Sequence, residues 1–339
     1  MTSRTRPLAV LGAGSWGTAL AMLIARRDQP VLLWDYNPEH VATLEKERRN
    51  SRYLPNFELP RQIIPTANLA SVTAQTREFV IAVPSHAFRA TLSALRESIP
   101  ELDHRCRFCW GTKGLEASSG KLLNEVFDEV IGQSAIRAAL SGPSFAREVA
   151  ARLPTALTVA ADDPIEAKRF AGWFHDNRTR IYTSGDLAGV QLGGAIKNVM
   201  AIAAGISDGL GFGANARGAL ITRGLAEMIR LGVALGGRAD TFQGLAGIGD
   251  LVLTCTDDQS RNRRVGLGVG QGNSLADVLR EIDQEAEGVG SARALYQKSQ
   301  GLSVEMPITE QVYRVLFAGI DPMIAVQTLL DREPRPEIG

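Results

Sequence analysis

The chain has 339 residues, of which 45% are hydrophobic and 22% charged, so it is long enough for two domains and can bury a substantial core. Lys plus Arg and Asp plus Glu both total 37, and this balance, with no basic tract beyond Arg261 to Arg264, argues against nucleic acid or an acidic membrane as a partner. The first residues lack the apolar core of a secretory signal, and no segment of about 20 apolar residues is free of helix-breaking glycines, so we expect a cytoplasmic protein without membrane insertion.

Short apolar segments alternate with helical patterns over the first half of the chain. The expected strands cover residues 8–12, 31–34, 79–83, 107–110, 138–142, 155–160 and 180–183, and the first three lead into expected helices at 15–27, 38–49 and 86–97. Strands that alternate with helices are typical of right-handed crossovers and a mostly parallel sheet. We therefore predict an α/β fold with a Rossmann-type, doubly wound N-terminal domain over residues 1–185.

Helical periodicity replaces the strand pattern after Ser184. The expected helices cover residues 186–208, 216–235, 274–282, 291–300, 307–317 and 322–330. This pattern predicts an all-helical domain over residues 186–339 that binds substrate and carries catalytic groups. The apolar character of this domain favours a homodimer.

The cysteines and histidines indicate neither a disulfide framework nor a metal site. Cys106 and Cys109 form a CxxC, but both lie in or beside an expected strand, where positions three apart point to opposite faces. The third cysteine, Cys255, stands alone. Because the four histidines are scattered without ligand spacing, we expect no metal.

The glycine-rich sequence GAGSWG, from Gly12 to Gly17, follows the first expected strand and opens a helix. In such a GxGxxG turn the glycines permit a tight turn, a close approach to a pyrophosphate and close packing of helix on strand. Asp35, at the end of the second expected strand, is placed to accept hydrogen bonds from an adenosine ribose, which favours NAD. Two alternatives remain: Asp35 is a solvated turn residue, or nearby arginines fold back toward the 2′-phosphate of NADP. These arginines are Arg48, Arg49 and Arg52.

Lys197 is the only charged residue between Leu187 and Ser207. If its side chain points into a cleft, burial lowers its pKa toward neutrality and makes it a usable general acid or base. The alternative is that the side chain extends along the helix to reach water.

Asp250 is likewise the only charged residue between Gly244 and Thr256, and Thr254 lies one helical turn further on. Two lone charges of opposite sign in apolar segments cost least if they meet in one site. We therefore predict a catalytic site that joins Asp250 and Thr254 to Lys197, with Asn198 as a neighbouring polar group that orients the lysine.

Three further segments place polar groups where a strand ends or a helix begins. Lys113 follows the expected strand at 107–110, and Gly142 and Ser144 follow the one at 138–142. The segment 260–262 can open a helix and offer a hydroxyl, a guanidinium and backbone N–H groups to a phosphate. Each has a structural alternative, namely a surface lysine, a helix cap and a solvated basic helix start.

Together these segments resemble the NAD(P)-dependent glycerol-3-phosphate dehydrogenases of the soluble bacterial type. The matching stretches are GAGSWGTALA (12–21), TKGLE (112–116), SGPSFAREVA (141–150), GVQLGGAIKNVMAI (189–202), FGANARGALITRGLAEM (212–228), LAGIGDLVLTCTDDQSRNRR (245–264) and EMPIT (305–309). The resemblance covers residues 8–330. It implies reversible reduction of dihydroxyacetone phosphate to sn-glycerol 3-phosphate with NAD or NADP as cofactor, supplying the backbone of phospholipids.

The resemblance also implies roles for single residues, with Lys197 as the proton donor or acceptor. The expected cofactor contacts are Gly12, Gly14, Ser15, Trp16, Gly17, Asp35, Tyr36, Lys113, Ala146, Arg261 and Glu287. The expected substrate contacts are Lys113, Gly142, Ser144, Lys197, Asp250, Ser260, Arg261 and Asn262.

One departure from the family concerns Asp35 and Tyr36, because many relatives carry a basic residue or histidine there. A strong preference for NADPH is therefore not expected, and the choice of cofactor stays open. Two rival functions also stay open: a reductase of another small ketone, of the β-hydroxyacid or ketopantoate type, and a nicotinamide-binding sensor without catalysis.

Overall fold

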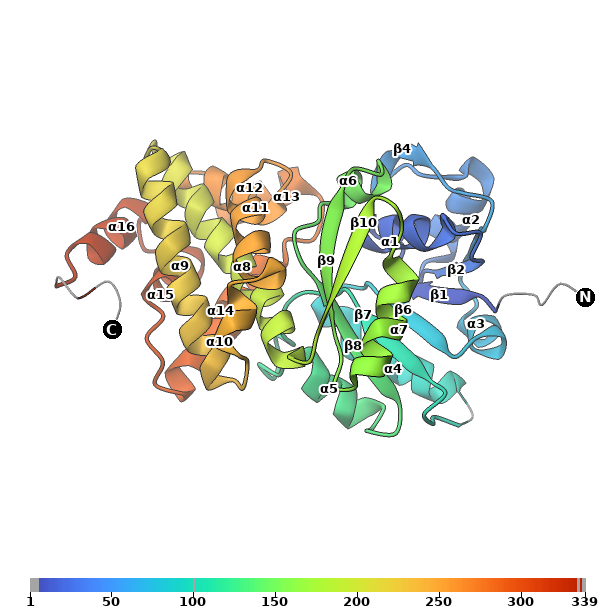
Figure 1. Cartoon of the computed structure of the whole chain (residues 1–339). Helices are drawn as coiled ribbons and strands as arrows, with labels where there is room; N and C mark the ends of the chain where they lie inside the picture. Colours follow the sequence, from blue (N-terminus) through green and yellow to red (C-terminus); the bar gives the residue numbers. More distant parts are fainter. Residues whose placement is uncertain (1–5, 100, 334–335, 337–339) are drawn as a thin grey trace, which may run out of the picture.

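A computed structural model of the chain describes residues 6–99, 101–333 and 336. Figure 1 shows two regions side by side, a sheet covered by helices and, at the C-terminal side, a cluster of helices. The α/β class with an N-terminal Rossmann-type sheet and a helical C-terminal part is thereby confirmed.

The main sheet has eight strands, and all neighbours are parallel except β8 and β9. In spatial order the strands are β10 (Thr179–Ser184), β9 (Thr155–Ala160), β8 (Ile136–Ser141), β7 (Arg107–Trp110), β6 (Glu78–Ile81), β1 (Leu8–Leu11), β2 (Val31–Trp34) and β5 (Ile63–Thr66). A separate antiparallel pair joins β3 (Arg49–Asn50) to β4 (Leu54–Glu58). The sequence did not predict β3, β4 or β5, because their short segments contain proline or mostly exposed residues and give no apolar run.

The order of the strands fixes where a ligand can bind. The chain passes from β1 to β2 and β5 on one side, and then returns to place β6 on the other side of β1. Ligands of open α/β sheets bind beyond the carboxyl ends of the strands at such a reversal. Gly12 directly follows β1 and therefore lies at this point.

Helices cover both faces of the sheet. One buried core joins α1 (Ser15–Ala25), α6 (Ala146–Ala150) and α7 (Pro164–Phe174), and the other joins α3 (Leu69–Gln75), α4 (Ser85–Ser98) and α5 (Leu123–Val130). The remaining helix of this region, α2 (Pro38–Glu47), starts at an Asn37 cap. Cys109 packs in the first core and Cys106 in the second, so the two thiols face opposite sides of the sheet as predicted. Both are free, and burial raises the pKa of the Cys109 thiol.

The C-terminal region is built around α8 (Leu187–Gly209), in which every residue from Gly189 to Ser207 is buried. The surrounding elements are α9 (Ala214–Ala234), α10 (Ala239–Phe242), the π-helical turn η1 (Leu245–Gly249), α11 (Asp250–Thr256), α12 (Arg261–Gly270), α13 (Leu275–Ile282), α14 (Glu287–Gly301), α15 (Pro307–Phe317) and α16 (Pro322–Leu330). The predicted ranges of α15 and α16 match those observed. The expected helical ranges did not include α10, η1 or α11, whereas α12 begins at the segment 260–262, where the sequence allowed a helix start.

The helix expected over residues 186–208 is confirmed by α8, although its glycines did not keep it from being long and apolar enough to resemble a membrane span. By length and composition α8 could cross a membrane, but 94% of its apolar window is buried inside the molecule, as in the core helix of a globular protein. Its glycines do not break it, because neighbouring backbones use the space. A Cβ atom on Gly193 would lie 2.1 Å from the Ala246 carbonyl oxygen, and one on Gly205 would lie 2.0 Å from that of Arg263.

Candidate active site

The glycine-rich turn has the geometry of a dinucleotide site. Gly12 has a φ of +102°, in the left-handed region that favours glycine, and a Cβ atom on Gly17 would lie 1.8 Å from the Gly12 carbonyl oxygen. Around Gly14, by contrast, a Cβ atom would meet nothing within 4 Å. Gly14 also precedes the N-terminus of α1, where no side chain caps the backbone N–H groups. The turn therefore leaves space and donors for a pyrophosphate at Gly14, next to the half-buried Ser15 and Trp16.

Asp35 is a buried residue at the end of β2, so the reading as a solvated turn residue was wrong. Its two carboxylate oxygens accept hydrogen bonds from the backbone N–H groups of Ala13 and Asn37, both at 3.0 Å. The following Tyr36 is 80% exposed. Asp35 thus braces the glycine-rich turn from the neighbouring strand, at the edge where a ribose would lie.

Of the three arginines that could reach a 2′-phosphate, Arg48 is already engaged. Its guanidinium donates to the carbonyl oxygens of Ile63, Leu59 and Pro60 at 3.1, 3.2 and 2.6 Å. Arg48 therefore holds α2 to the chain before β5. The other two, Arg49 and Arg52, are exposed.

The two lone charges of the sequence meet in the helical region. Lys197, inside α8, donates from Nζ to Asp250 Oδ1 at 2.6 Å and to Thr254 Oγ1 at 2.9 Å. Lys113 approaches from the segment after β7 and donates to the other oxygen, Asp250 Oδ2, at 2.7 Å. One carboxylate thus holds two ammonium groups, one from each region of the molecule. The alternative that Lys197 reaches water is excluded, since its side chain is only 7% exposed.

Burial and neighbouring charges set the titration of this cluster. Burial lowers the pKa of Lys197 to about 7, a shift that Asp250 opposes and Lys113 increases. Burial alone would raise the pKa of Asp250, but the two ammonium groups outweigh it and hold that pKa below its usual value. Lys197 can therefore gain or lose a proton near neutral pH while Asp250 stays ionised.

Asn198 follows Lys197 on α8 and is buried. Among the described residues the Lys197 ammonium donates to Asp250 and Thr254, and the Asn198 side chain makes no hydrogen bond to it. The predicted orienting role of Asn198 stays a prediction, and Thr254 is the neutral group in contact.

The segment 260–262 opens α12 next to this cluster. Ser260 is the N-cap, and its hydroxyl accepts a hydrogen bond from the Arg263 N–H. The Asn262 side-chain oxygen accepts from the Gly288 N–H at 2.9 Å, which leaves its NH₂ group free to donate. Arg261 is half-buried, and its guanidinium makes no hydrogen bond to another described residue. Two free donors at a helix N-terminus suit a phosphate group.

Gly142, Ser144 and Ala146 lie between β8 and α6. Gly142 has a φ of +129°, and its carbonyl oxygen accepts hydrogen bonds from Ser144 Oγ at 3.0 Å and Lys113 Nζ at 3.4 Å. The turn therefore touches the lysine cluster through its backbone. Ala146 is the first residue of α6.

Glu287, at the start of α14, lies against a residue that the sequence did not single out. Its carboxylate accepts from the Ser85 N–H at 2.9 Å and the Ser85 hydroxyl at 2.5 Å, at the N-terminus of α4. Burial raises the pKa of Glu287. The contact joins residues 202 positions apart and links the two regions beside the site. The Pro84–Ser85 pair after the strand segment 79–83 is a helix-start signal that could have identified Ser85.

Two stretches that carry the resemblance, residues 212–228 and 305–309, meet away from this site. Glu227 of α9 is buried and accepts hydrogen bonds from the Ile308 and Thr309 N–H groups at 2.6 and 3.2 Å. These N–H groups open α15, so the carboxylate caps that helix. The two stretches therefore hold α9 to α15.

Comparison with known families places similarity over nearly the whole chain. The model described as NAD-dependent glycerol-3-phosphate dehydrogenase N-terminus matches residues 7–167. The corresponding C-terminus model matches residues 186–327. The two matches together cover most of the sheet region, without β10, and most of the helical region.

Individual proteins are also similar over nearly the whole length of this chain. The glycerol-3-phosphate dehydrogenase (NAD(P)+) of Methylococcus capsulatus is 54% identical over 331 residues, 97% of this chain and 98% of the relative. The solved glycerol-3-phosphate dehydrogenase of Coxiella burnetii is 46% identical, with a TM-score of 0.93 over 97% of this chain and 99% of that one. A 2-dehydropantoate 2-reductase of Enterococcus faecalis, a representative of the rival ketone reductases, reaches 14% identity and a TM-score of 0.50 and shares the fold alone.

Proposed function

This chain belongs to the NAD-dependent glycerol-3-phosphate dehydrogenase family, and on that premise we propose how its residues divide the work of the reaction. The enzyme reversibly reduces dihydroxyacetone phosphate to sn-glycerol 3-phosphate with NADH or NADPH. Neither rival is favoured, because relatives that are 52% to 54% identical to this chain are named as this dehydrogenase.

The dinucleotide, when bound, supplies the hydride, and residues at the carboxyl ends of the strands hold it. Gly12, Gly14 and Gly17 with the N-terminus of α1 would take the pyrophosphate, and Asp35 would face the adenosine ribose. The indole Nε1 of Trp16 is buried without a hydrogen-bond partner among the described residues, which supports a polar ligand there. The further cofactor contacts that we propose are Ser15, Tyr36, Lys113, Ala146, Arg261 and Glu287.

The substrate phosphate would bind where α12 begins. Arg261 offers a guanidinium, Asn262 a free NH₂ group, and the N-terminus of α12 its partial positive charge. Ser260, Gly142 and Ser144 would line the same space. This arrangement would place the ketone of the substrate toward the ammonium groups of Lys197 and Lys113.

Reduction of the ketone adds a hydride to carbon C2 and a proton to its oxygen. Lys197, protonated, would donate that proton and stabilise the negative charge that develops on the oxygen. In the reverse direction the neutral amine would take the proton from the hydroxyl. Asp250 and Thr254 fix the position of the ammonium, which confines the proton to one place in the site.

A single observation carries this proposal. Lys197 is a buried lysine whose ammonium donates to Asp250 Oδ1 at 2.6 Å, and burial lowers its pKa to about 7. A structural lysine would not need the second ammonium of Lys113 on the same carboxylate.

The test is oxidation of the reduced cofactor by the purified protein. Dihydroxyacetone phosphate is added with NADH and with NADPH in parallel, and unphosphorylated dihydroxyacetone serves as the control. We expect rapid loss of reduced nicotinamide absorbance with the phosphorylated ketone alone, and the faster cofactor reports the influence of Asp35. Equal rates with both ketones would refute the phosphate site at α12.

We also propose a division into domains at residues 1–185 and 186–339, a homodimer, a cytoplasmic location and a role in phospholipid synthesis. The dimer is supported by α16, whose apolar side chains Met323, Ile324 and Leu330 are 47%, 60% and 72% exposed. Light scattering of the native protein and of an Ile324→Glu variant checks it. A monomer mass for the native protein would disprove the dimer.

A further inference from the structure

The segment between β7 and α5, residues 111–122, carries Lys113 and is irregular. Gly114 has a φ of +126°, and a Cβ atom there would lie 3.1 Å from Ser85 Oγ and 3.2 Å from Glu287 Oε2. No helix or strand fixes this segment, yet Lys113 must meet Asp250 from it. Other contacts must therefore hold the segment in place.

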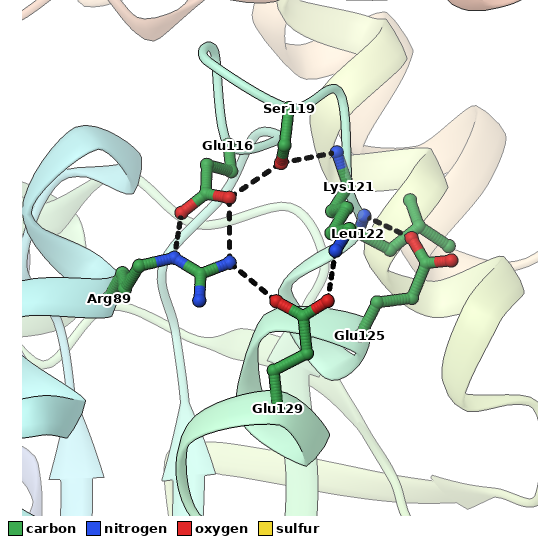
Figure 2. A network of polar contacts seen from close by, with 7 residues as sticks. All are labelled: Arg89, Glu116, Ser119, Lys121, Leu122, Glu125 and Glu129. Atoms are coloured by element: carbon green, nitrogen blue, oxygen red, sulfur yellow. Dashed lines mark hydrogen bonds and ion pairs between the residues drawn. The ribbon is translucent and has the colours of Figure 1, made fainter.

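Figure 2 shows a network of polar and charged residues that joins residues 116–122 of this segment to α4 and α5. Glu116 accepts from Arg89 Nε at 2.7 Å and Arg89 Nη2 at 2.9 Å, a bidentate pair, and from Ser119 Oγ at 2.5 Å. Arg89 also donates to Glu129 of α5 at 2.7 Å, and Glu129 pairs with Lys121. The network thus ties the second half of the segment, from Glu116 onward, to α4 and α5.

In the central pair of this network the carboxylate is sheltered, whereas the Arg89 side chain is 37% exposed. The Glu116 side chain is 10% exposed, and the Arg89 hydrogen bond holds its pKa below the usual value. A bidentate guanidinium–carboxylate pair of this kind fixes direction as well as distance. Two backbone hydrogen bonds join the ends of the turn 116–121. The Glu116 N–H donates to the Lys121 carbonyl at 3.0 Å, and the Gly120 N–H donates to the Glu116 carbonyl at 2.8 Å.

Only two residues separate Glu116 from Lys113. Thr112, on the other side of Lys113, donates from Oγ1 to the Val83 carbonyl at 2.7 Å, beyond the end of β6. Lys113 therefore lies between two contacts that hold the segment. One is the Thr112 hydrogen bond to Val83, and the other is the Arg89–Glu116 pair. Loosening either contact frees the Lys113 side chain to leave Asp250.

We propose that Arg89 and Glu116 are positioning residues, which hold Lys113 against Asp250 through the segment 111–122. This inference rests on the proposed function, in which Lys113 lies in the substrate site. Neither residue touches the lysine cluster, so their effect on the reaction passes through the segment that carries Lys113 and that also packs Gly114 against Ser85 and Glu287.

The test compares three variants of the full-length enzyme by steady-state kinetics and thermal unfolding. Arg89→Met removes the pair, Lys113→Met removes the positioned group, and Arg107→Met is the matched control. Arg107 makes an equivalent bidentate pair with Glu166, at 2.7 and 2.9 Å, at the end of β7 opposite the segment. We expect Arg89→Met to lower kcat/KM for dihydroxyacetone phosphate about tenfold, and Arg107→Met to leave it unchanged at a similar loss of Tm.

The pH profile gives a second readout that a purely structural role would not move. The Lys113 ammonium lowers the pKa of Lys197, so its departure shifts the falling limb of the reduction profile to higher pH. Of the other neighbours of Lys197, Asp250 stays ionised, and burial raises the pKa of the Cys255 thiol to about 12, above the range measured. Arg89→Met and Lys113→Met should therefore shift the limb in the same direction.

The outcomes distinguish failure of the positioning role from failure of the Lys113 assignment. If Lys113→Met lowers kcat/KM and Arg89→Met behaves like Arg107→Met, the positioning role is overturned and the proposed function stands. If Lys113→Met leaves kcat/KM unchanged, the assignment of Lys113 fails and takes the inference with it. Glu116→Gln repeats the test should Arg89→Met not fold, and Arg89→Lys should restore part of the activity because it keeps the charge without the fork.

Discussion

The two regions of the molecule present their charged groups to the site in different ways. In the sheet region Asp35 and Lys113 lie in connections that follow strands, held by backbone groups and by neighbouring side chains. In the helical region Lys197 and Asp250 lie inside helices, with side chains only 7% and 1% exposed. Groups in connections depend on neighbouring contacts for their position, whereas groups inside helices are positioned by the helix itself, and burial there lowers the pKa of Lys197. We therefore expect the sheet region to govern binding of the dinucleotide and the helical region to govern proton transfer and phosphate binding.

The strongest test of this division is Lys197→Met. Loss of the proton donor and of its charge should lower kcat by about 10³-fold or more, while the Kd of the dinucleotide stays within about twofold. Turnover kinetics and a fluorescence titration measure the two quantities, and Lys46→Met, at an exposed position of α2, is the control. A kcat near that of the native enzyme would remove Lys197 from the mechanism.

The next effect is expected from Arg261→Leu. A charge-assisted bond to phosphate contributes about 1.5–3 kcal/mol, so KM for dihydroxyacetone phosphate should rise about 10- to 100-fold. The slow reaction with unphosphorylated dihydroxyacetone should not change. Arg264→Leu, three positions further along α12 and exposed, is the matched control. Equal effects of the two variants on KM would place the phosphate elsewhere.

The pH dependence of the native enzyme tests proton transfer by Lys197 without a substitution in the helical region. Reduction requires protonated Lys197, so kcat/KM should fall about tenfold per unit as the pH rises above the lysine pKa of about 7. Oxidation of glycerol 3-phosphate requires the neutral amine and should fall on the acid side instead. Asp250 raises the pKa of Lys197, so Asp250→Asn should move the reduction limb to lower pH. A limb that does not move would show that another group titrates.

The smallest effect concerns two glycines of the same turn. Gly14→Ala places a methyl group in open space, so stability should hold while dinucleotide Kd rises up to about tenfold. Gly17→Ala places it 1.8 Å from the Gly12 carbonyl oxygen and should lower the free energy of unfolding by about 1–3 kcal/mol. Calorimetry with and without NADH separates the two. Unchanged binding by Gly14→Ala would contradict the proposed pyrophosphate position.

Local sequence patterns predicted much of the fold and the two central residues of the site. The strands of the sheet core are apolar runs, and Lys197 and Asp250 stand out because each is alone in an uncharged segment. Their meeting followed from the cost of burying an unpaired charge, and the structure places them 2.6 Å apart. The roles of the remaining site residues stay predictions.

Other features depend on contacts that a linear pattern does not contain. The Arg89–Glu116 pair joins ordinary charged residues of two separate segments, and Ser85 meets Glu287 across 202 positions. Glycines in α8 and α12 resemble helix breakers in the sequence. They instead allow contact between helices, since a Cβ atom on Gly266 would lie 2.0 Å from the Ile202 carbonyl oxygen.

Helix α8 enters two hydrophobic cores in succession: Leu187 and Val190 pack with the sheet, and residues from Leu192 onward pack with the helices. Lys197 therefore lies ten residues after Leu187, or about 15 Å further along the axis of α8. Insertion or deletion of one residue between Val190 and Lys197 would turn the lysine by about 100° and withdraw it from Asp250. This stretch cannot change its length without displacing Lys197, so we expect insertions and deletions among relatives to lie in the turns outside α8.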